Sequence, residues 1–595
     1  MLLGDLVSQP VTSSQAVSGL ATSLLAKACA LQPSRESASE LKTSCKLSSK
    51  HLQYRKYSPF RLSGVHLLIY EKIPHKTKKS VLKPQLPTMQ TTEKTEPKLL
   101  DLKTRLREIN DIEAAASLLY WDQATYMPPG GAEARGRQLA TLQQISHSKF
   151  TEPAVGQLLE DLRSLEKTLP YHSDDASLIR VTRRKYEAAV RVPAEFMAKL
   201  SMHRTESYEA WAAARPANNF AAVRPYLEKT LDMSRELANF FPGYDHIADP
   251  LIDFADYGMK TSFLRSLFAE LREQLVPIVE AITSQTPPDD SCLRQDYPEA
   301  QQLKFTLKII EQLGYDFQRG RQDKTHHPFM INFSVGDVRI TTRVYENDLG
   351  QALFSSIHEM GHALYEQGIN RDYEGTPLAC GTSSGVHESQ SRLWENFVGR
   401  SLGFWKHFYP QLQAFFPKQL SHVSLDTFYR AINKVERSLI RTDADEVTYN
   451  LHVMIRFDLE LQMLEGSLEV KDLPEAWNQR YRSDLGIVPE TDSAGVLQDV
   501  HWYTGQIGGM FQGYTLGNLM SAQFFEAALQ ADLEILTEIE QGDCNTLHNW
   551  LRDKIYQHGC KYTATELIRG VTGADLRIDP YIRYIRRKYG QLYTL

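Results

Sequence analysis

A histidine–glutamate pattern at residues 358–362 is the strongest chemical signal in the chain. Its sequence, His358-Glu359-Met-Gly-His362, has the form H-E-x-x-H. On a helix, side chains four residues apart lie one above the other, so both imidazoles can reach one Zn²⁺ ion. Glu359 follows the first histidine directly and can act as general base toward a metal-bound water. The pattern therefore predicts metal-dependent hydrolysis.

Glu388 is the candidate third ligand. Catalytic zinc sites combine three protein ligands with one open position. Glu388 stands 30 residues after His358 and begins another amphipathic stretch, from which an antiparallel helix would bring its carboxylate to the two histidines. Two other interpretations stay open on spacing alone. One is an ordinary amphipathic helix with two surface histidines, and the other is a solvated glutamate at a helix start.

Helices must carry these residues. An apolar stripe at helical spacing accompanies the H-E-x-x-H pattern, and Gly368 is a natural stop after it. The stripe consists of Leu353, Ile357, Met360 and Leu364. Other amphipathic stretches, the first with Pro97 at a suitable first position, predict further helices. They cover 97–120, 175–213, 217–240, 261–283, 297–313, 346–367, 387–402, 424–470 and 514–539.

One stretch differs from this pattern. Residues 329–345 alternate β-branched and aromatic side chains on both sides of Val335-Gly336-Asp337, which is a turn signal. Such a stretch predicts a β-hairpin. We therefore expect a mainly α fold, a large helical body with a small sheet inserted at its middle.

Composition limits the partners. The 595 residues include 67 Lys+Arg and 73 Asp+Glu, a net charge of −6. Residues 1–88 carry +9, so residues 89–595 carry −15. An acidic body argues against nucleic acid as the main partner, because phosphate binding requires a clustered positive surface. No apolar run approaches the roughly 20 residues that span a bilayer, so we expect a soluble protein without a membrane partner.

The cysteines indicate the redox environment. The six of them, at positions 29, 45, 292, 380, 544 and 560, form no C-x-x-C pair. We therefore expect neither a disulfide framework nor a thiolate zinc site, and a reducing compartment fits better.

The basic segment 1–88 is rich in serine and has little helical periodicity. It has two interpretations, an organelle transit peptide or a segment upstream of a true start at Met89. We favour the second, which makes the protein cytoplasmic; the first would place it in an organelle. In either case we expect 1–88 to be non-catalytic and disordered, and 89–595 to form a single catalytic domain.

Several further motifs follow one another along the chain. They are His327-Pro328-Phe329, Asp337-x-Arg339-x-Thr341, His387-Glu388-Ser389, Ile440-Arg441-x-x-Ala444-Asp445 and Gly495-x-x-Gln498-Asp499-x-His501-Trp502. Together with H-E-x-x-H they resemble, over about 97–595, the thermostable carboxypeptidase (carboxypeptidase Taq) family of zinc metallocarboxypeptidases. Upstream, Trp121-Asp122 and Met127-Pro128 resemble the family's N-terminal helical region.

The resemblance implies a neurolysin-like gluzincin architecture with a deep active-site groove. It implies that His358, His362 and Glu388 are the metal ligands and that Glu359 is the general base. It also implies removal of single residues from the C-termini of peptides, with broad specificity, by a homodimer. Zinc suits such a ligand set, and Co²⁺ or Mn²⁺ can replace it.

An exopeptidase needs a cation for the terminal carboxylate of its substrate, and arginine binds carboxylates bidentately. By family likeness we expect Arg441 to have this role. The alternative is a structural ion pair between Arg441 and Asp443 or Asp445.

The oxyanion of the tetrahedral intermediate needs a donor besides the metal. His501 and Tyr514 are the best candidates, and Tyr503 is a third. They lie in a glycine-rich stretch that could adapt as a groove closes. Family members typically have Phe-Pro-x-Tyr where this chain has Phe511-Gln512-Gly513-Tyr514, so we expect a looser loop before Tyr514.

Two further pairs have structural interpretations. Asp337 and Arg339 either organise the sheet and groove wall or form a structural ion pair. The adjacent His326 and His327 favour a structural role beside the hairpin over a second metal site. Two other functions remain alternatives for the whole chain: a zinc endopeptidase or dipeptidase using the same site, and an inactive helical binding scaffold.

Overall fold

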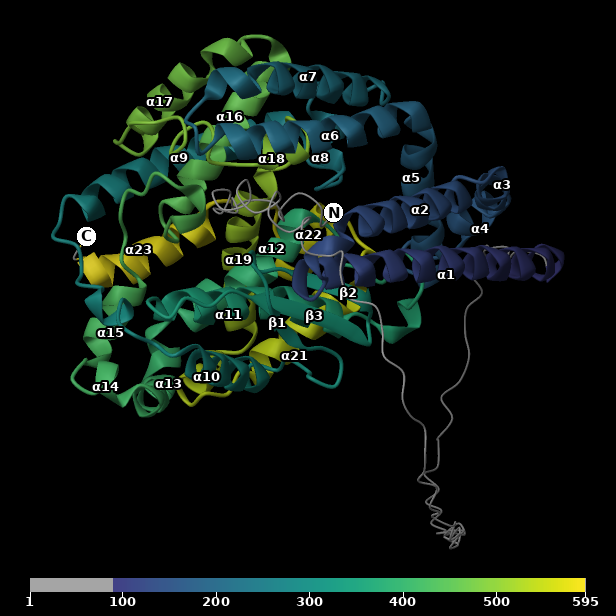
Figure 1. Ribbon diagram of the computed structural model, residues 1–595. Helices are drawn as coiled ribbons and strands as arrows, with labels where there is room; N and C mark the ends of the chain where they lie inside the picture. Colours follow the sequence, from purple (N-terminus) through teal and green to yellow (C-terminus); the bar gives the residue numbers. More distant parts are fainter. Residues whose placement is uncertain (1–88, 594) are drawn as a thin grey trace, which may run out of the picture. The chain divides into compact units, whose positions relative to one another are not determined.

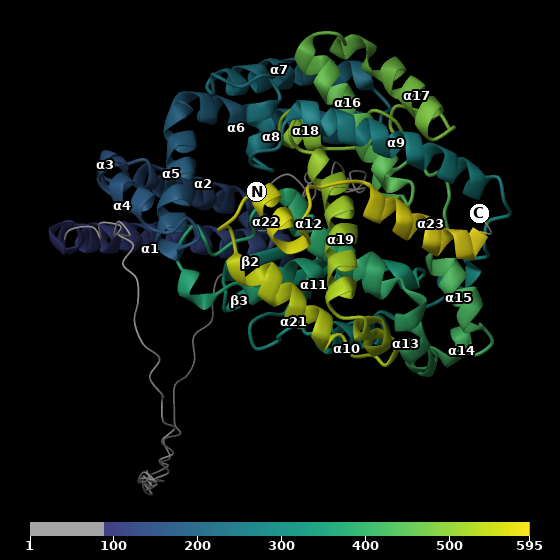
Figure 2. The ribbon, with the colours of Figure 1, turned by 180° about the vertical axis from the view of Figure 1, so that it is seen from behind.

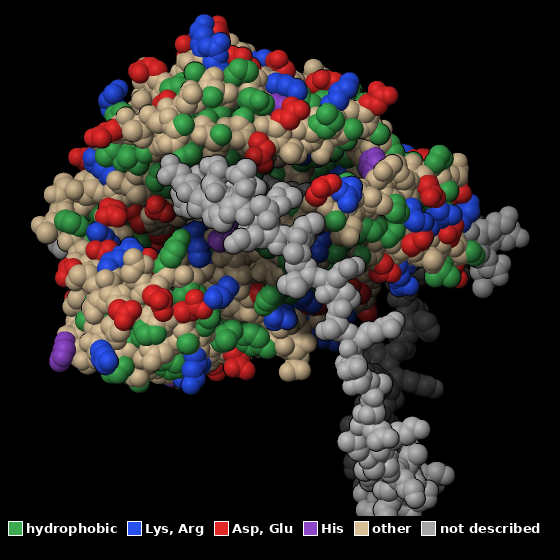
Figure 3. Space-filling view, in the orientation of Figure 1, with side chains coloured by type: hydrophobic (Ala, Val, Ile, Leu, Met, Phe, Trp, Pro, Cys, Tyr) green, Lys and Arg blue, Asp and Glu red, His purple; other side chains and the backbone are tan. Residues whose placement is uncertain are grey.

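The computed structural model describes residues 89–593 and residue 595 (Figure 1). The expectations for residues 1–88 therefore lie outside the described residues. Within the described part the fold is mainly helical with one small sheet, as expected. Every helix there is too short or too polar to span a bilayer. On the face drawn in Figure 3, acidic and basic side chains are interspersed. The described side chains visible on it form no extended basic patch.

The first helices of the described part lie together at one side in both ribbon views (Figures 1 and 2). A separate cluster of buried apolar residues, including Leu102, Val155 and Ile179, holds them together. They are α1 (Met89–Thr125), α2 (Ala132–Phe150), α3 (Pro153–Asp161), α4 (Arg163–Thr168) and α5 (Asp174–Arg191).

A second group of helices lies at the top of Figure 1. Their apolar faces join one continuous core that extends through the rest of the described chain. The group consists of α6 (Ala194–Ala214), α7 (Phe220–Asn239), α8 (Asp249–Asp253), α9 (Thr261–Thr283), α16 (Tyr449–Glu465), α17 (Leu473–Asp484) and α18 (His501–Thr504).

A third group lies at the bottom of Figure 1, together with the sheet. It consists of α10 (Glu299–Gln312), α11 (Leu349–Gly368), α13 (Leu402–Phe415), α14 (Pro417–Leu420), α15 (Leu425–Ile432), α20 (Glu534–Glu540) and α21 (Asn545–Lys554). Between the upper and lower groups run α12 (Ser384–Arg392), α19 (Gln512–Ala531), α22 (Ala564–Thr572) and α23 (Asp579–Tyr593). Helix α19 contacts α12 and α23 in this middle group and α16 in the upper group.

The sheet contains the expected hairpin. Strands β2 (Met330–Ser334) and β3 (Asp337–Thr342) pair antiparallel, with Met330 opposite Ile340. A short strand, β1 (Gln322–Lys324), pairs parallel to β3 and makes the order β1-β3-β2. The sheet packs on α11, so the hairpin supports the helix that carries the H-E-x-x-H pattern.

Several predicted helix boundaries were wrong. Helix α1 begins at Met89, so Pro97 lies inside it and not at its first position. The stretch 175–213 divides into α5 and α6 at Pro193, because a proline disfavours helical geometry in the residue before it. The stretch 514–539 divides into α19 and α20, with Asp532 in extended geometry between them.

The largest error concerns 424–470. It is two helices, α15 and α16, separated by a segment that contains only one 3₁₀ turn, η5 (Arg441–Asp443). Asp445 stabilises the start of α16, because its carboxylate accepts the N–H groups of Val447 and Thr448 at 2.9 and 3.1 Å. A carboxylate that binds main-chain N–H groups competes with helix continuation, and apolar periodicity does not detect it.

Candidate metal centre and active site

The three predicted ligand residues converge. His358 and His362 lie on α11, whose N-terminus is capped by Asp348, and Glu388 lies on the adjacent α12. One ligand atom from each lies within 4.8 Å of the others. The Nε2 atoms of His358 and His362 are 3.6 and 3.5 Å from Oε2 of Glu388. Among the described residues this is the one group of histidine, cysteine or carboxylate side chains with metal-binding geometry.

The outer atoms of both histidines have partners. Nδ1 of His358 is 2.9 Å from Oε2 of Glu395, and Nδ1 of His362 is 3.1 Å from the main-chain oxygen of His387. Such contacts fix the imidazole orientation and direct Nε2 inward, as expected for metal-binding histidines. The residues present therefore fit a divalent metal ion.

The charges around the centre favour an ionised Glu388. Burial would raise the pKa of this carboxyl, but Arg392 and the two histidines hold it well below its usual range. Arg392 donates to Oε1 of Glu388 at 2.7 Å. Burial lowers the pKa of His362 to about 4, so this imidazole is neutral at pH 7. A neutral imidazole and a carboxylate are the protonation states that metal binding requires.

Close helix packing holds Glu388 in place. A Cβ at Gly361 of α11 would lie 2.7 Å from Cα of Ser391, and a Cβ at Gly517 of α19 would lie 2.5 Å from Cγ of Glu388. Real contacts are not this short, so glycine at both positions lets α11 and α19 approach α12 from two sides. Helix α12, which carries the predicted ligand Glu388, is thereby confined between two neighbours.

Glu359 is buried, with 8% of its surface exposed, and it directly follows His358 on α11. Gly368 is the last residue of α11 and packs against Tyr556, where a Cβ would lie 2.6 Å from Cβ of the tyrosine. Both features agree with the predicted helix, although its stop is not a left-handed glycine beyond the helix end.

Arg441 belongs to a buried charged cluster. Its partner is Asp499, at 2.9 Å from Nη2, and not Asp443 or Asp445 as the alternative interpretation suggested. Arg456 also binds Asp499, so two guanidinium groups share one carboxylate. These cations hold the pKa of Asp499 well below its usual range despite its burial.

His501 and Tyr514 lie at this cluster. Nε2 of His501 is 3.4 Å from the hydroxyl of Tyr514, and the Arg441 guanidinium lies over the tyrosine ring at 5.2 Å. Tyr449 connects the cluster with the metal centre. It accepts a hydrogen bond from Arg441 at 2.9 Å, and Arg392 lies over its ring at 4.6 Å.

The remaining predicted residues are placed as follows. Tyr503 is buried and stacks on Trp211 at 6.0 Å. Gly513 lies in the first turn of α19 and not in a loop, so the expected looser loop before Tyr514 was wrong. A Cβ at Gly513 would lie 2.9 Å from Cβ of Ser384, so this glycine serves close packing.

Asp337 and Arg339 form a bidentate ion pair at 2.8 and 2.7 Å, and the arginine lies over Trp121 of α1 at 4.4 Å. This is the structural ion pair that the sequence allowed. His326 and His327 belong to no metal-binding group among the described residues. Nδ1 of His327 contacts the Pro328 oxygen at 2.9 Å.

The sequence interpretation missed the residues that surround the predicted ligands. Glu395 lies in a π-helical segment, η4 (Leu393–Gly399), and also binds Arg400 at 3.2 Å. His387 contacts Oε1 of Glu366 at 3.0 Å. The spacing of Glu388, Arg392 and Glu395, at i, i+4 and i+7, was the available signal, because these positions share one helical face.

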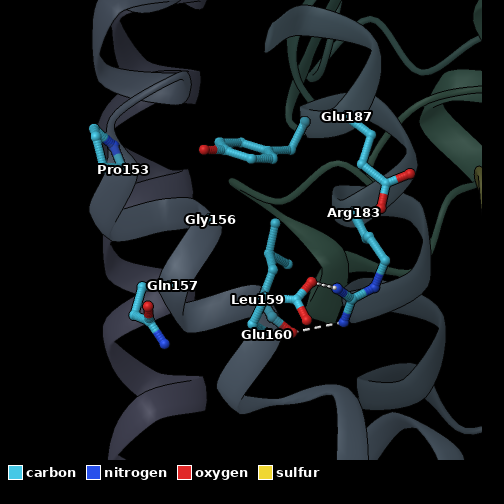
Figure 4. Close-up of a pocket in the computed structure, with 8 residues that line it drawn as sticks. Pro153, Gly156, Gln157, Leu159, Glu160, Arg183 and Glu187 are labelled. Carbon is cyan, nitrogen blue, oxygen red and sulfur yellow. Dashed lines mark hydrogen bonds and ion pairs between the residues drawn. The ribbon is translucent and has the colours of Figure 1, made fainter. Parts of the chain in front are cut away.

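A separate pocket of about 320 Å³ lies between α3 and α5 (Figure 4). Its lining includes Gly156, Glu160 and Arg183, and none of the predicted site residues. Arg183 is already paired with Glu160 and Glu166 at 3.0 and 3.1 Å. The pocket therefore offers no unpaired cation for a ligand.

Comparisons with known proteins agree with this geometry. A family model described as carboxypeptidase Taq (M32) metallopeptidase matches residues 101–589. Thermostable carboxypeptidase 1 of Thermus thermophilus is 41% identical over 498 residues, which are 82% of this chain and 97% of the relative. Carboxypeptidase 1 of Bacillus subtilis is 36% identical over 491 residues, again 82% and 97% of the two chains. The crystal structure of an M32 carboxypeptidase from Deinococcus radiodurans superposes with a TM-score of 0.82 at 47% identity, covering 84% of this chain and all of that one.

Proposed function

Because the chain belongs to the carboxypeptidase Taq (M32) metallopeptidase family, we propose that His358, His362 and Glu388 hold the metal ion of a metallocarboxypeptidase. The family, the helical fold class and the carboxypeptidase activity are as expected from the motifs. Membership also implies a divalent metal and peptide substrates. The observation that carries the site assignment is the convergence of the two Nε2 atoms on Oε2 of Glu388.

Zinc is the proposed metal. Two imidazoles and one carboxylate are the donor set of a catalytic zinc site, and Co²⁺ or Mn²⁺ also suits it. When bound, the ion polarises the scissile carbonyl and lowers the pKa of a water molecule. Elemental analysis of purified protein identifies the metal, and stoichiometric zinc is the expected result.

Glu359 is the proposed general base. It accepts the proton of the attacking water and returns a proton to the leaving amine. Its buried position directly after His358 on α11 supports this role. His501 or Tyr514 donates to the oxyanion, since both lie at the Arg441 cluster, and Tyr503, which stacks on Trp211, is the less suitable third candidate.

Arg441 is the proposed partner of the substrate's terminal carboxylate. Asp499 compensates only one of the two guanidinium charges in the cluster with Arg456, so a net positive charge remains. Buried uncompensated charge is costly, and a substrate carboxylate would neutralise it. This argument favours an exopeptidase over the endopeptidase alternative.

Product analysis tests the function. Peptides with a free C-terminus should lose single residues in order, and matched amidated peptides should be cut at least tenfold more slowly. Equal rates would favour the endopeptidase, dipeptides as the only substrates would favour the dipeptidase, and no cleavage by the zinc-loaded protein would favour the scaffold.

Three further proposals concern organisation and location. Residues 89–595 form one catalytic domain, the protein is a homodimer, and it is cytoplasmic. Light scattering during size-exclusion chromatography measures the molar mass and so tests the dimer. N-terminal sequencing of native protein distinguishes a start at Met89 from a processed leader, which would place the protein in an organelle.

A further inference from the structure

The cysteines of the described residues fall into two kinds. Cys292 and Cys544 are buried separately, and burial raises their pKa values to about 11 and 12. Such thiols stay protonated and are chemically inert. Cys380 and Cys560 have different surroundings, although 180 residues separate them in the sequence.

Main-chain contacts bring Cys380 and Cys560 together. The N–H of Cys560 donates to the oxygen of Leu378 at 3.1 Å. Gly559 has a φ of +49°, and a Cβ there would lie 3.3 Å from the main-chain oxygen of Cys380. The two thiols share a hydrogen bond. Cys560 is 3% exposed, and Cys380 is partly exposed as a residue.

Two cations from α5 face the sulfur atoms. Nζ of Lys185 is 3.9 Å from Sγ of Cys380, and Nη2 of Arg184 is 3.9 Å from Sγ of Cys560. The preceding residue, Arg183, points toward Glu160 (Figure 4). One turn of α5 therefore places two positive charges beside a pair of thiols.

These charges favour a thiolate. The hydrogen bond from Cys380, together with Lys185 and Arg184, outweighs burial and lowers the pKa of Cys560 to about 5. The pKa of Cys380 is raised, so Cys380 keeps its proton, which it also donates to the main-chain oxygen of Pro377 at 3.5 Å, and Cys560 is the thiolate. A thiolate beside a second thiol is the arrangement found in redox-sensitive sites.

We propose that Cys380 and Cys560 form a redox-active dithiol, which hydrogen peroxide converts into an intramolecular disulfide. The thiolate of Cys560 attacks one oxygen of the peroxide, which gives a sulfenic acid and releases hydroxide. The thiol of Cys380 then attacks the sulfenic sulfur, the S–S bond forms and water leaves. In net terms the two thiols are oxidised, and one peroxide is reduced to two water molecules.

The disulfide would connect two segments near the metal centre. Cys380 precedes Gly381, whose N–H donates to Oε1 of Glu366 at 2.9 Å, and α12 begins at Ser384. Cys560 lies before α22. A bond that closes a loop of about 180 residues lowers the conformational entropy of the unfolded chain and thereby stabilises the fold. The proposal concerns a modification site and does not depend on the role of any metal ligand.

Differential alkylation of the full chain tests the proposal. Reduced protein is treated with hydrogen peroxide, denatured, alkylated with iodoacetamide, reduced again and alkylated with N-ethylmaleimide. Peptide mapping should show the second label on Cys380 and Cys560, and the first label on Cys292 and Cys544. A disulfide-linked pair of peptides should be detected before the second reduction. The Tm of the oxidised protein should be a few degrees higher than that of the reduced protein.

Variants identify the partners. In C380S, Cys560 should be trapped as a sulfenic acid by dimedone, and the cross-link and the Tm shift should disappear. C544S is the matched control, and its cross-link should form as in the natural sequence. Peptide hydrolysis by the reduced C380S variant serves as the control that this variant is folded. The proposal is overturned if both thiols take the first label after peroxide treatment, or if Cys560 pairs with another cysteine.

Discussion

Nδ1 of His358 lies 2.9 Å from Oε2 of Glu395, so a carboxylate seven residues after Glu388 orients the first of the proposed metal ligands. The π-helical geometry of η4 brings Glu395 to this position, where Arg392 and Arg400 also bind it. Short π-helical segments inside α-helices often mark functional sites.

Glu395→Gln should weaken metal binding. An amide still accepts a hydrogen bond from His358 but removes the charge that makes the imidazole a better ligand. Metal affinity should fall roughly 10–100-fold, as for other residues that orient metal ligands. Competition with a chelator measures it. Glu540→Gln, at an exposed ion pair with Lys406, is the control and should bind metal normally. Equal affinity in both variants would contradict the orienting role.

Glu359→Gln should retain the metal and lose activity. The amide cannot accept the proton of the attacking water, so kcat should fall by about 10²–10⁴. Metal content and Tm, measured on the same preparation, should match those of the natural protein. Turnover that persists at the natural rate would eliminate Glu359 as the base.

Arg441→Lys should impair recognition of the terminal carboxylate. Lysine keeps the charge but lacks the planar fork, so kcat/KM for peptides with a free C-terminus should fall roughly 10–100-fold. The slow cleavage of amidated peptides should change little. Arg430→Lys, at an exposed pair with Asp426, is the matched control. If both kinds of peptide lose activity equally, the cluster with Asp499 is structural.

Gly361→Ala should disturb the contact between α11 and α12. The added Cβ would meet the main chain of Gln390 and Ser391 at 2.7 Å, so the helices must separate. We expect a loss of about 1–3 kcal/mol in the free energy of unfolding, with weaker metal binding. Gly570→Ala is the control, since a Cβ there has no neighbour within 4 Å. Denaturant unfolding of both variants separates the effect of packing from that of helix propensity. Equal free energies of unfolding for the two variants would refute the close approach of α11 and α12.

Glu460 should make stability depend on pH. It is fully buried on α16 and accepts a hydrogen bond from Trp502 at 2.9 Å, and burial raises its pKa to about 7. The folded state therefore keeps a proton that the unfolded state has lost. Its contribution to stability is present below about pH 4.3 and is lost as the pH rises to about 7, roughly 3 kcal/mol in all.

Glu460→Gln removes this dependence, because an amide does not titrate. The free energy of unfolding of the variant, minus that of the natural protein, should rise by about 3 kcal/mol between pH 4.5 and 7.5. Glu475→Gln, on the exposed side of α17, should show no such rise. A constant difference for both variants would mean that Glu460 stays ionised in the fold.

The local features of the fold were predictable from the sequence. The apolar stripe around His358 and His362 identified α11, and alternation around Gly336 identified the hairpin. Both patterns report which side of an element is buried, which is a local property. The convergence of Glu388 with the histidines followed from the motif order and from the helical stretch that begins near it.

The errors arose where distant residues decide the conformation. Between α15 and α16, Asp445 binds the N–H groups of Val447 and Thr448, and Arg441 pairs with the distant Asp499, which apolar periodicity does not report. The strand β1 has three residues, which are too few for periodicity, and β3 determines its conformation. Glu395 contacts His358 from within the π-helical segment η4, and the i, i+4, i+7 spacing that indicated Glu395 does not indicate such a segment.

The position of α19 has a consequence for the newly synthesised chain. This helix forms one of the two walls around α12, yet it begins more than a hundred residues after Glu388. At about 5–20 residues per second, a ribosome needs roughly 6–25 s to supply it after the last ligand residue has been made. During that interval Glu388 lacks the packing of α19 against it. We therefore expect the proposed site to bind metal tightly only after translation has passed α19.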